Sequence, residues 1–296
     1  MSASTGAKLM SKFYNNLSGM IGASWEDVLL DNARRVSAPL AIRMLDQIGL
    51  NSATSTPFKL FDSGCGAGVV AAEVHRVVQP SVLAKSSVLC GDYSEQVIGL
   101  VKKRIEGEGW IGTEARKVDA QKTELESASF THMTMNIGFH VVPDSEAALD
   151  EAIRVLKPGG ILGFTTWTGM LGWAPDMEEA FKSFPFEAPF KVSVQTTPWG
   201  NWGDVNWVRD TLEKKGLQDV RTDVTANLHR VDGPDHYIGT LSMIIKWLWE
   251  SWPEELKKEH GFDEVEGLVK EFVDKKYDGK EWDLIWVAIV ASGRVV

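Results

Sequence analysis

The sequence has few cysteines, an excess of acidic over basic residues and no long apolar run. Its only cysteines, Cys65 and Cys90, allow neither a disulfide framework nor metal-ligand spacing, so we expect reduced thiols and no bound metal. No apolar run approaches the ~20 residues that span a bilayer. The first residues, MSASTGAKLMSKFYNNL, lack the apolar core of a signal peptide. These absences predict a cytoplasmic protein without a membrane partner.

The net charge of −10 is a second constraint. Nucleic-acid binding depends on many Lys and Arg contacts to phosphates, so this balance argues against a nucleic-acid partner. The net charge does not argue against uncharged small molecules as ligands. Hydrophobic residues make up 44% of the chain and charged residues 24%, as in ordinary globular proteins. At 296 residues the chain can bury a full core, in one large domain or in a domain with a sizeable cap.

Short apolar runs alternate with amphipathic stretches through the middle of the chain. The alternation predicts an α/β fold with a Rossmann-like, mostly parallel, seven-stranded sheet and helices on both of its faces. The first five strands are expected at residues 58–64, 87–94, 115–121, 131–137 and 161–167.

Two regions are expected to cover this sheet. Residues 26–50 have apolar residues at helical spacing with a break expected at Pro39, and we assign residues 1–50 to an N-terminal helical lid. Ten of the twelve tryptophans lie from Trp167 onward. We therefore predict a main domain over 51–296, with a helical and irregular substrate cap inserted at 168–203 and 233–280. The segment KPGG, residues 157–160, is expected to be a turn.

Acidic side chains close three successive predicted strands, at Asp62, Asp92 and Asp119, and Asn136 and Trp167 close the next two. Ligands of parallel sheets bind at the carboxyl ends of the strands. A buried sheet seldom tolerates charge, so the acids should lie at its ligand-facing rim.

The loop LFDSGCGAG, residues 60–68, has glycines at three alternate positions. A dinucleotide fingerprint would need a small residue where Val69 stands and an acid about 20 residues on, whereas Asp92 follows Gly64 by 28. A P-loop would need a lysine, and none occurs between Lys59 and Lys85. S-adenosylmethionine remains as a candidate, because it has no phosphate to hold.

The residues at the rim suit the three parts of S-adenosylmethionine. Gly64 and Gly66 let the backbone approach the methionine tail without a clashing Cβ. Asp92 can accept two hydrogen bonds from the ribose diol, because a carboxylate has two acceptor oxygens. Asp119 can accept from the adenine amino group while the Ala120 amide donates to a ring nitrogen.

Four motifs occur in a fixed order: LFDSGCGAG, CGDYS, VDAQ and LKPGGILGF. With them the chain resembles the class I S-adenosylmethionine-dependent methyltransferases. The stretch FHVVPDSEAALDEAIRVLKPGGILGFTTW is similar to fungal secondary-metabolism methyltransferases of the gliotoxin bis-thiomethyltransferase type. The resemblance covers residues 10–175, and it departs from the family at Thr131-His132, where an acid usually opens the fourth strand.

The resemblance implies S-adenosylmethionine as cofactor and a class I methyltransferase domain over 51–296. The predicted cofactor-binding residues are Tyr14, Asp62, Gly64, Cys65, Gly66, Asp92, Tyr93, Asp119, Ala120 and Asn136.

The acceptor is predicted to be a small aromatic or apolar natural product, methylated at O, N or S. Aromatic walls suit such a ligand, although core packing is the alternative role for most of the tryptophans. Methyl transfer from a sulfonium chiefly needs alignment and desolvation. A base is needed only for a protonated nucleophile, and His140, just past the fourth strand, is the predicted base. The predicted substrate-binding residues are Trp25, Trp167, Trp173, Trp199 and Trp202.

Two other functions stay open. One is a non-methylating reaction on the same fold, such as a pericyclic or cyclisation step. The other is a regulatory subunit that senses the cofactor. Formation of S-adenosylhomocysteine with an acceptor would separate methyl transfer from both. The apolar helix that carries WLWESW, residues 247–252, is also a candidate homodimer contact.

Overall fold

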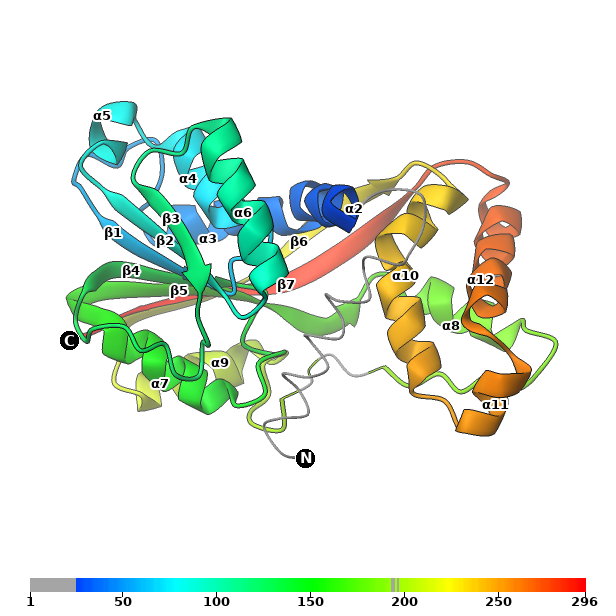
Figure 1. The fold of residues 1–296 in the computed structure, drawn as a ribbon. Helices are drawn as coiled ribbons and strands as arrows, with labels where there is room; N and C mark the ends of the chain where they lie inside the picture. The colour runs from blue at the N-terminus through cyan, green and yellow to red at the C-terminus, as the bar shows by residue number, and fades with distance from the viewer. Residues whose placement is uncertain (1–24, 193–194, 196) are drawn as a thin grey trace.

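A seven-stranded sheet runs through the centre of the protein, of which the computed structural model describes residues 25–192, 195 and 197–296 (Figure 1). The strand order is β3-β2-β1-β4-β5-β7-β6. Strands β1 to β5 pair in parallel, and β7 runs antiparallel between β5 and β6. This arrangement confirms the predicted Rossmann-like, mostly parallel sheet. The strands are β1 (Lys59–Ser63), β2 (Ser87–Asp92), β3 (Thr113–Lys117), β4 (Phe130–Asn136), β5 (Leu156–Leu171), β6 (Gln218–Val231) and β7 (Trp282–Arg294).

Helices cover both faces of the sheet, as predicted. α3, α4 and α6 lie on one face and α7 and α9 on the other, and a hydrophobic core fills each side (Figure 1). Successive side chains of a strand point to opposite faces of the sheet. Leu60 of β1 therefore packs into the first core and Phe61 into the second. The described helices are α2 (Trp25–Asn32), the π-helical turn η2 (Ala33–Ser37), α3 (Ala38–Gln47), α4 (Val69–Val77), α5 (Pro80–Leu83), α6 (Glu95–Glu108), α7 (Ser145–Val155), α8 (Ala174–Lys182), α9 (Val205–Lys214), α10 (Pro234–Glu250), α11 (Glu254–Glu259) and α12 (Phe262–Tyr277).

The helices α8, α10, α11 and α12 form a cap beyond the ends of the long strands β5, β6 and β7 (Figure 1). The cap has a third hydrophobic core, built mainly from these helices and the first residues of β7, to which η2 contributes Val36 and β6 contributes Val231. No helix in the described part of the chain is long and apolar enough to cross a membrane. The predicted lid begins outside the described residues, and its boundaries and those of the cap insertions stay predictions.

The turn predicted at KPGG is instead an irregularity inside β5. The strand begins at Leu156, which pairs with Phe130, and regular pairing resumes at Ile161 opposite His132. Gly159 has a φ of +78° within this bulge, which glycine tolerates because it lacks a Cβ. The turn signal therefore marks a bulge after the strand has already begun.

The expected break at Pro39 is a change of helix type, not an end. The helix passes from α2 through η2 into α3, whose first turn contains Pro39. Proline has no N–H, so the α-helical hydrogen bond to the Arg35 carbonyl four residues back is missing. Asn227 Nδ2, on β6, donates to that carbonyl at 2.8 Å. A contact from a distant strand thus replaces the bond that Pro39 removes.

Candidate functional site

A cavity of about 390 Å³ lies at the carboxyl ends of the parallel strands. One side is formed by the glycine loop after β1 and by the ends of β2 and β4. Residues of α2 and η2, together with Trp167 of β5 and Met243 of α10, complete the wall. The cavity brings together nine of the ten predicted cofactor-binding residues, and Tyr14 lies outside the described residues. The nine are Asp62, Gly64, Cys65, Gly66, Asp92, Tyr93, Asp119, Ala120 and Asn136.

The glycine loop presents bare backbone to this cavity. Gly64 and Gly66 have φ angles of +65° and +51°, which side chains rarely adopt. Apart from its chain neighbours, a Cβ placed on either residue would meet no atom of the described residues within 4 Å, and both glycines line the cavity. Between them Cys65 is buried, and contact with the Cys90 thiol together with burial raises the pKa of Cys65 well above its ordinary value. The backbone groups of this loop and the neutral Cys65 thiol are therefore available to a ligand.

Asp62 is the most unusual group at the rim. Its side chain is fully buried, and Oδ1 accepts a hydrogen bond from Thr134 Oγ1 at 2.9 Å. Oδ2 has no partner among the described residues, although buried polar atoms are nearly always paired. Burial, reinforced by the negative charge of Asp92, raises the pKa of Asp62 to about 7. An unpaired buried carboxylate oxygen in a cavity wall suits a cationic group of a ligand.

Asp92 already holds the glycine loop in place. Its Oδ2 accepts from the Gly66 amide at 3.1 Å and its Oδ1 from the Ser94 amide at 3.0 Å. Burial raises the pKa of Asp92, and these amide contacts oppose the rise. Each carboxylate oxygen can accept a second hydrogen bond. The side chain can thus receive a diol and shape the loop at the same time.

The end of β3 supplies the next two predicted residues. Asp119 and Ala120 are half-buried, and Asp119 Oδ1 accepts from both the backbone amide and the side chain of Gln121 at 2.9 Å. This turn holds the carboxylate in the cavity wall. Tyr93 lines the cavity although it is 47% exposed, and the Lys117 ammonium lies 5.5 Å from its ring centroid.

Asn136 connects the sheet to the helical wall. Its Nδ2 donates to the Ser37 carbonyl at 3.2 Å, and its Oδ1 accepts from Thr165 Oγ1 at 2.6 Å. The next residue, Ile137, has a φ of +59°, which is strained for a β-branched side chain. Its amide donates to Thr165 Oγ1 at 2.9 Å, which helps to hold this turn. The chain therefore leaves β4 sharply and lines the cavity with Ile137.

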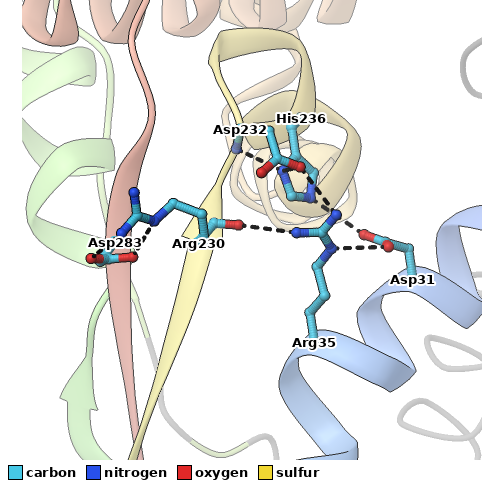
Figure 2. A network of polar contacts seen from close by, with 6 residues as sticks. All are labelled: Asp31, Arg35, Arg230, Asp232, His236 and Asp283. Atoms are coloured by element: carbon cyan, nitrogen blue, oxygen red, sulfur yellow. Dashed lines mark hydrogen bonds and ion pairs between the residues drawn. The ribbon is translucent and has the colours of Figure 1, made fainter.

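The helical wall is also fixed from its outer side, by a polar network that joins η2 to β6 and α10 (Figure 2). Arg35 donates from Nε to Asp31 and from Nη2 to Asp232, both at 3.0 Å. Its Nη1 donates to the Arg230 carbonyl at 3.4 Å. His236 Nε2 lies 3.3 Å from the other Asp31 oxygen. The wall facing the predicted cofactor and the cap helix α10 are thus parts of one connected structure.

The structure places His140 outside the described cavity wall, so the geometry gives no support to its predicted role as a base, which stays a prediction. The side chain is only 2% exposed, and Nδ1 shares a hydrogen bond with Thr166 Oγ1 at 3.0 Å. Burial lowers the pKa of His140 to about 4. Its neighbour Val141 lines the cavity instead. The side chain after β4 turns inward, so His140 belongs to the protein core.

Of the five tryptophans predicted to bind substrate, Trp167 lines the cavity and the other four do not. Trp173 is buried in the core of the cap. Trp202 is buried under α7, where its Nε1 donates to Ser145 Oγ at 3.1 Å, and Trp199 packs against it. Trp25 packs on the core beneath α3 and α4. Core packing, the alternative role, accounts for these four.

Sequence reasoning missed the residues that the helices bring to the cavity. The predicted cap ranges contribute Met243 alone to the described wall. Leu29, Asn32, Ala33 and Ser37 come from α2 and η2. Their spacing of three to four residues is a signal of one helix face, but it does not say what that face covers.

Comparisons with known proteins agree with the motifs. A family model described as a methyltransferase domain matches residues 61–164, from β1 into β5. Methyltransferase tpcH of Aspergillus fumigatus is 27% identical over 266 residues, which are 88% of this chain and 93% of that protein. The acetylaranotin bis-thiomethyltransferase of Aspergillus terreus is 26% identical over 253 residues, covering 84% and 86% of the two chains. Both relatives are fungal methyltransferases, as the sequence resemblance predicted.

The fold has solved counterparts as well. The crystal structure of the [4+2]-cyclase SpnF matches with a TM-score of 0.53 at 16% identity, covering 100% of this chain and 97% of that one. At this identity the match shows the fold alone.

Proposed function

Because the chain belongs to the S-adenosylmethionine-dependent methyltransferases, we propose that it methylates a small apolar or aromatic acceptor of the natural-product type. The observation that carries the proposal is the division of the cavity into two chemically different ends. The acids Asp62, Asp92 and Asp119 lie at or just after the ends of the neighbouring strands β1, β2 and β3, whereas the ends of the next strands in the sheet, β4 and β5, bring the apolar Met135, Ile137 and Trp167 to the cavity.

The acidic end fits the cofactor. S-adenosylmethionine is the family's methyl donor, and when bound it supplies an electrophilic methyl group on a sulfonium. The unpaired Asp62 Oδ2 would accept the cofactor's ammonium, and the bare backbone at Gly64 and Gly66 leaves room for the methionine tail. Asp92 would receive the ribose diol, and Asp119 with Ala120 the adenine. These assignments are the ones predicted from the sequence, and the residues that they name all line one cavity.

The apolar end suits the acceptor. It is formed by the ends of β4 and β5, the helical wall and α10, and its members include Met135, Ile137, Trp167 and Met243. A ligand held between a tryptophan and two methionines would be flat or apolar, because such walls offer contact area and few hydrogen bonds. Trp167 thus keeps its predicted role as a substrate-binding residue within this proposal.

The proposed mechanism relies on alignment and on exclusion of water, not on a base. The titratable side chains of the described cavity wall are Asp62, Cys65, Asp92, Tyr93 and Asp119, all at the cofactor end. His140 is too deeply buried to reach an acceptor. The nucleophile must therefore arrive without its proton, as a thiolate or a free amine does, or lose it to water. Desolvation at the apolar end would then raise its reactivity toward the methyl group.

The test is turnover with a panel of arylthiols, phenols and arylamines. The purified protein and S-adenosylmethionine should give S-adenosylhomocysteine and a product one methylene heavier, about 14 mass units. The variant Asp92→Asn is the inactive control, since it loses the charge that would receive the ribose and, with a single acceptor oxygen, cannot accept from both the Gly66 and the Ser94 amides. A product that appears without S-adenosylhomocysteine would support the alternative, a non-methylating reaction on this fold. The homodimer and the absence of nucleic-acid partners stay predictions.

A further inference from the structure

Trp286 carries a buried hydrogen-bond donor that nothing in the described structure satisfies. Its side chain is 6% exposed, and no acceptor among the described residues lies within reach of its indole Nε1. Indole nitrogen can only donate, so no rearrangement of its own proton relieves the cost. Because buried donors are nearly always paired, such a group needs an explanation.

The position of Trp286 links this donor to the apolar end of the cavity. Trp167 pairs with Ala288 across β5 and β7, and Trp286 lies on the same face of β7 as Ala288, two residues away. The rings of Trp167 and Trp286 lie 5.1 Å apart between centroids. Trp167 lines the cavity and Trp286 does not, so Trp286 is a residue of the cap core that contacts the cavity wall from behind Trp167.

We propose that Trp286 is a specificity-determining residue that donates a hydrogen bond to a carbonyl oxygen of the acceptor. The acceptor reaches Nε1 by shifting the ring of Trp167, and it satisfies the donor that the free protein leaves unpaired. The acceptor class is therefore a flat, apolar molecule with a carbonyl group on the side away from the methylated atom. This inference rests on the proposed methyl transfer, because it assigns the apolar end to the acceptor.

Trp282 offers a matched comparison on the same strand face. Its Nε1 is also buried and unpaired among the described residues. However, its ring stacks on Tyr277 at 4.1 Å and contacts Tyr237, both in the core of the cap. It does not border Trp167 or the cavity. Trp282→Phe and Trp286→Phe therefore remove the same atoms and the same kind of unpaired donor. Of the two residues, only Trp286 contacts Trp167 of the cavity wall.

The experiment uses acceptor probes in pairs: 4-acetyl- and 4-ethyl-thiophenol, and the corresponding phenols and anilines. The two groups have similar size and differ by the carbonyl oxygen. For each enzyme the ratio of kcat/KM between acetyl and ethyl probes is measured, so that differences in intrinsic reactivity cancel between enzymes. We expect Trp286→Phe to lower this ratio about three- to tenfold, the value of one neutral hydrogen bond. Trp282→Phe should keep the wild-type ratio, and the Kd of S-adenosylmethionine should not change in Trp286→Phe.

Any of the following three results would overturn the inference. If S-adenosylhomocysteine forms but the ratio is the same in wild type and Trp286→Phe, the indole N–H does not recognise the carbonyl. If Trp282→Phe lowers the ratio equally, the effect is a general loosening of the cap. If no probe is methylated, the proposed function fails for these acceptors and the carbonyl subsite fails with it.

Discussion

Replacing Asp62 by asparagine should remove a pH dependence of cofactor binding that the wild type shows. Burial raises the pKa of Asp62 to about 7, so near neutral pH the free protein holds a mixture of protonated and ionised side chains. Only the ionised form can pair with the cofactor's ammonium. If binding requires that form, the apparent Kd should fall about eightfold between pH 6 and pH 7.5. Above that range the affinity should level off, because the α-amino group itself titrates near 7.7–8.0.

The folded-state pKa of Asp62 lies above its ordinary value of 3.8. The folded protein therefore binds more protons than the unfolded chain between these two values, and its stability falls as the pH rises from about 4 to about 7. The ionised side chain would cost on the order of 4 kcal/mol at pH 8. Asp62→Asn avoids this cost, and its amide oxygen can still accept from Thr134. Without cofactor the variant should be more stable than wild type at pH 8 and gain less at pH 5.

Calorimetric titration with S-adenosylmethionine is the assay. In buffers of different ionisation enthalpy at pH 7, wild-type binding should release about half a proton, whereas Asp62→Asn should release less. The variant should bind about ten- to a hundredfold more weakly at pH 7.5, the loss expected for a charge-assisted hydrogen bond, and its Kd should vary less with pH. A wild-type Kd that is constant from pH 6 to 7.5, with heats independent of buffer, would refute the placement of the ammonium on Asp62.

Two further predictions follow from the helical wall and the core. Arg35→Ala should weaken cofactor binding through the loosened wall while lowering stability by at most about 1 kcal/mol, because its ion pairs are partly exposed. Arg230→Ala, which loses ion pairs to Glu281 and Asp283 on the far side of β6, is the matched control and should bind the cofactor normally. His140→Asn should lower Tm but leave the pH dependence of turnover as in wild type, because His140 is buried away from the cavity. A fall in turnover of about a hundredfold or more, with the wild-type fold intact, would restore the base role.

The cofactor end of the cavity could be predicted from the sequence because its residues are tied to regular local patterns. Strand-helix alternation places the end of each parallel strand at one rim, and Asp62, Asp92 and Asp119 each follow a recognisable apolar run. Local spacing is enough here, because the sheet itself brings the three ends together.

Apart from Trp167, the proposed acceptor end could not be predicted, because its residues are selected by long-range packing. Trp167 and Trp173 are six residues apart, yet one lines the cavity and the other fills the core of the cap. Met243 reaches the cavity because contacts between residues far apart in the sequence hold α10 beside α2, among them Asn32 Nδ2 to the Thr240 carbonyl at 3.4 Å. Residue type predicts that a tryptophan will be buried, but not in which core. The burial of His140 illustrates the same limit, since nearness to a strand end does not fix the direction of a side chain.

The separate core of the cap has a consequence for how such an enzyme can diverge. The matched methyltransferase domain ends at residue 164, within β5, and the cap is built on later parts of the chain. Substitutions in α8, α10 or α12 repack a core that is separate from the two cores on the faces of the sheet, although Val36 of the helical wall belongs to it. A lineage can therefore inherit its donor chemistry unchanged while its acceptor range drifts.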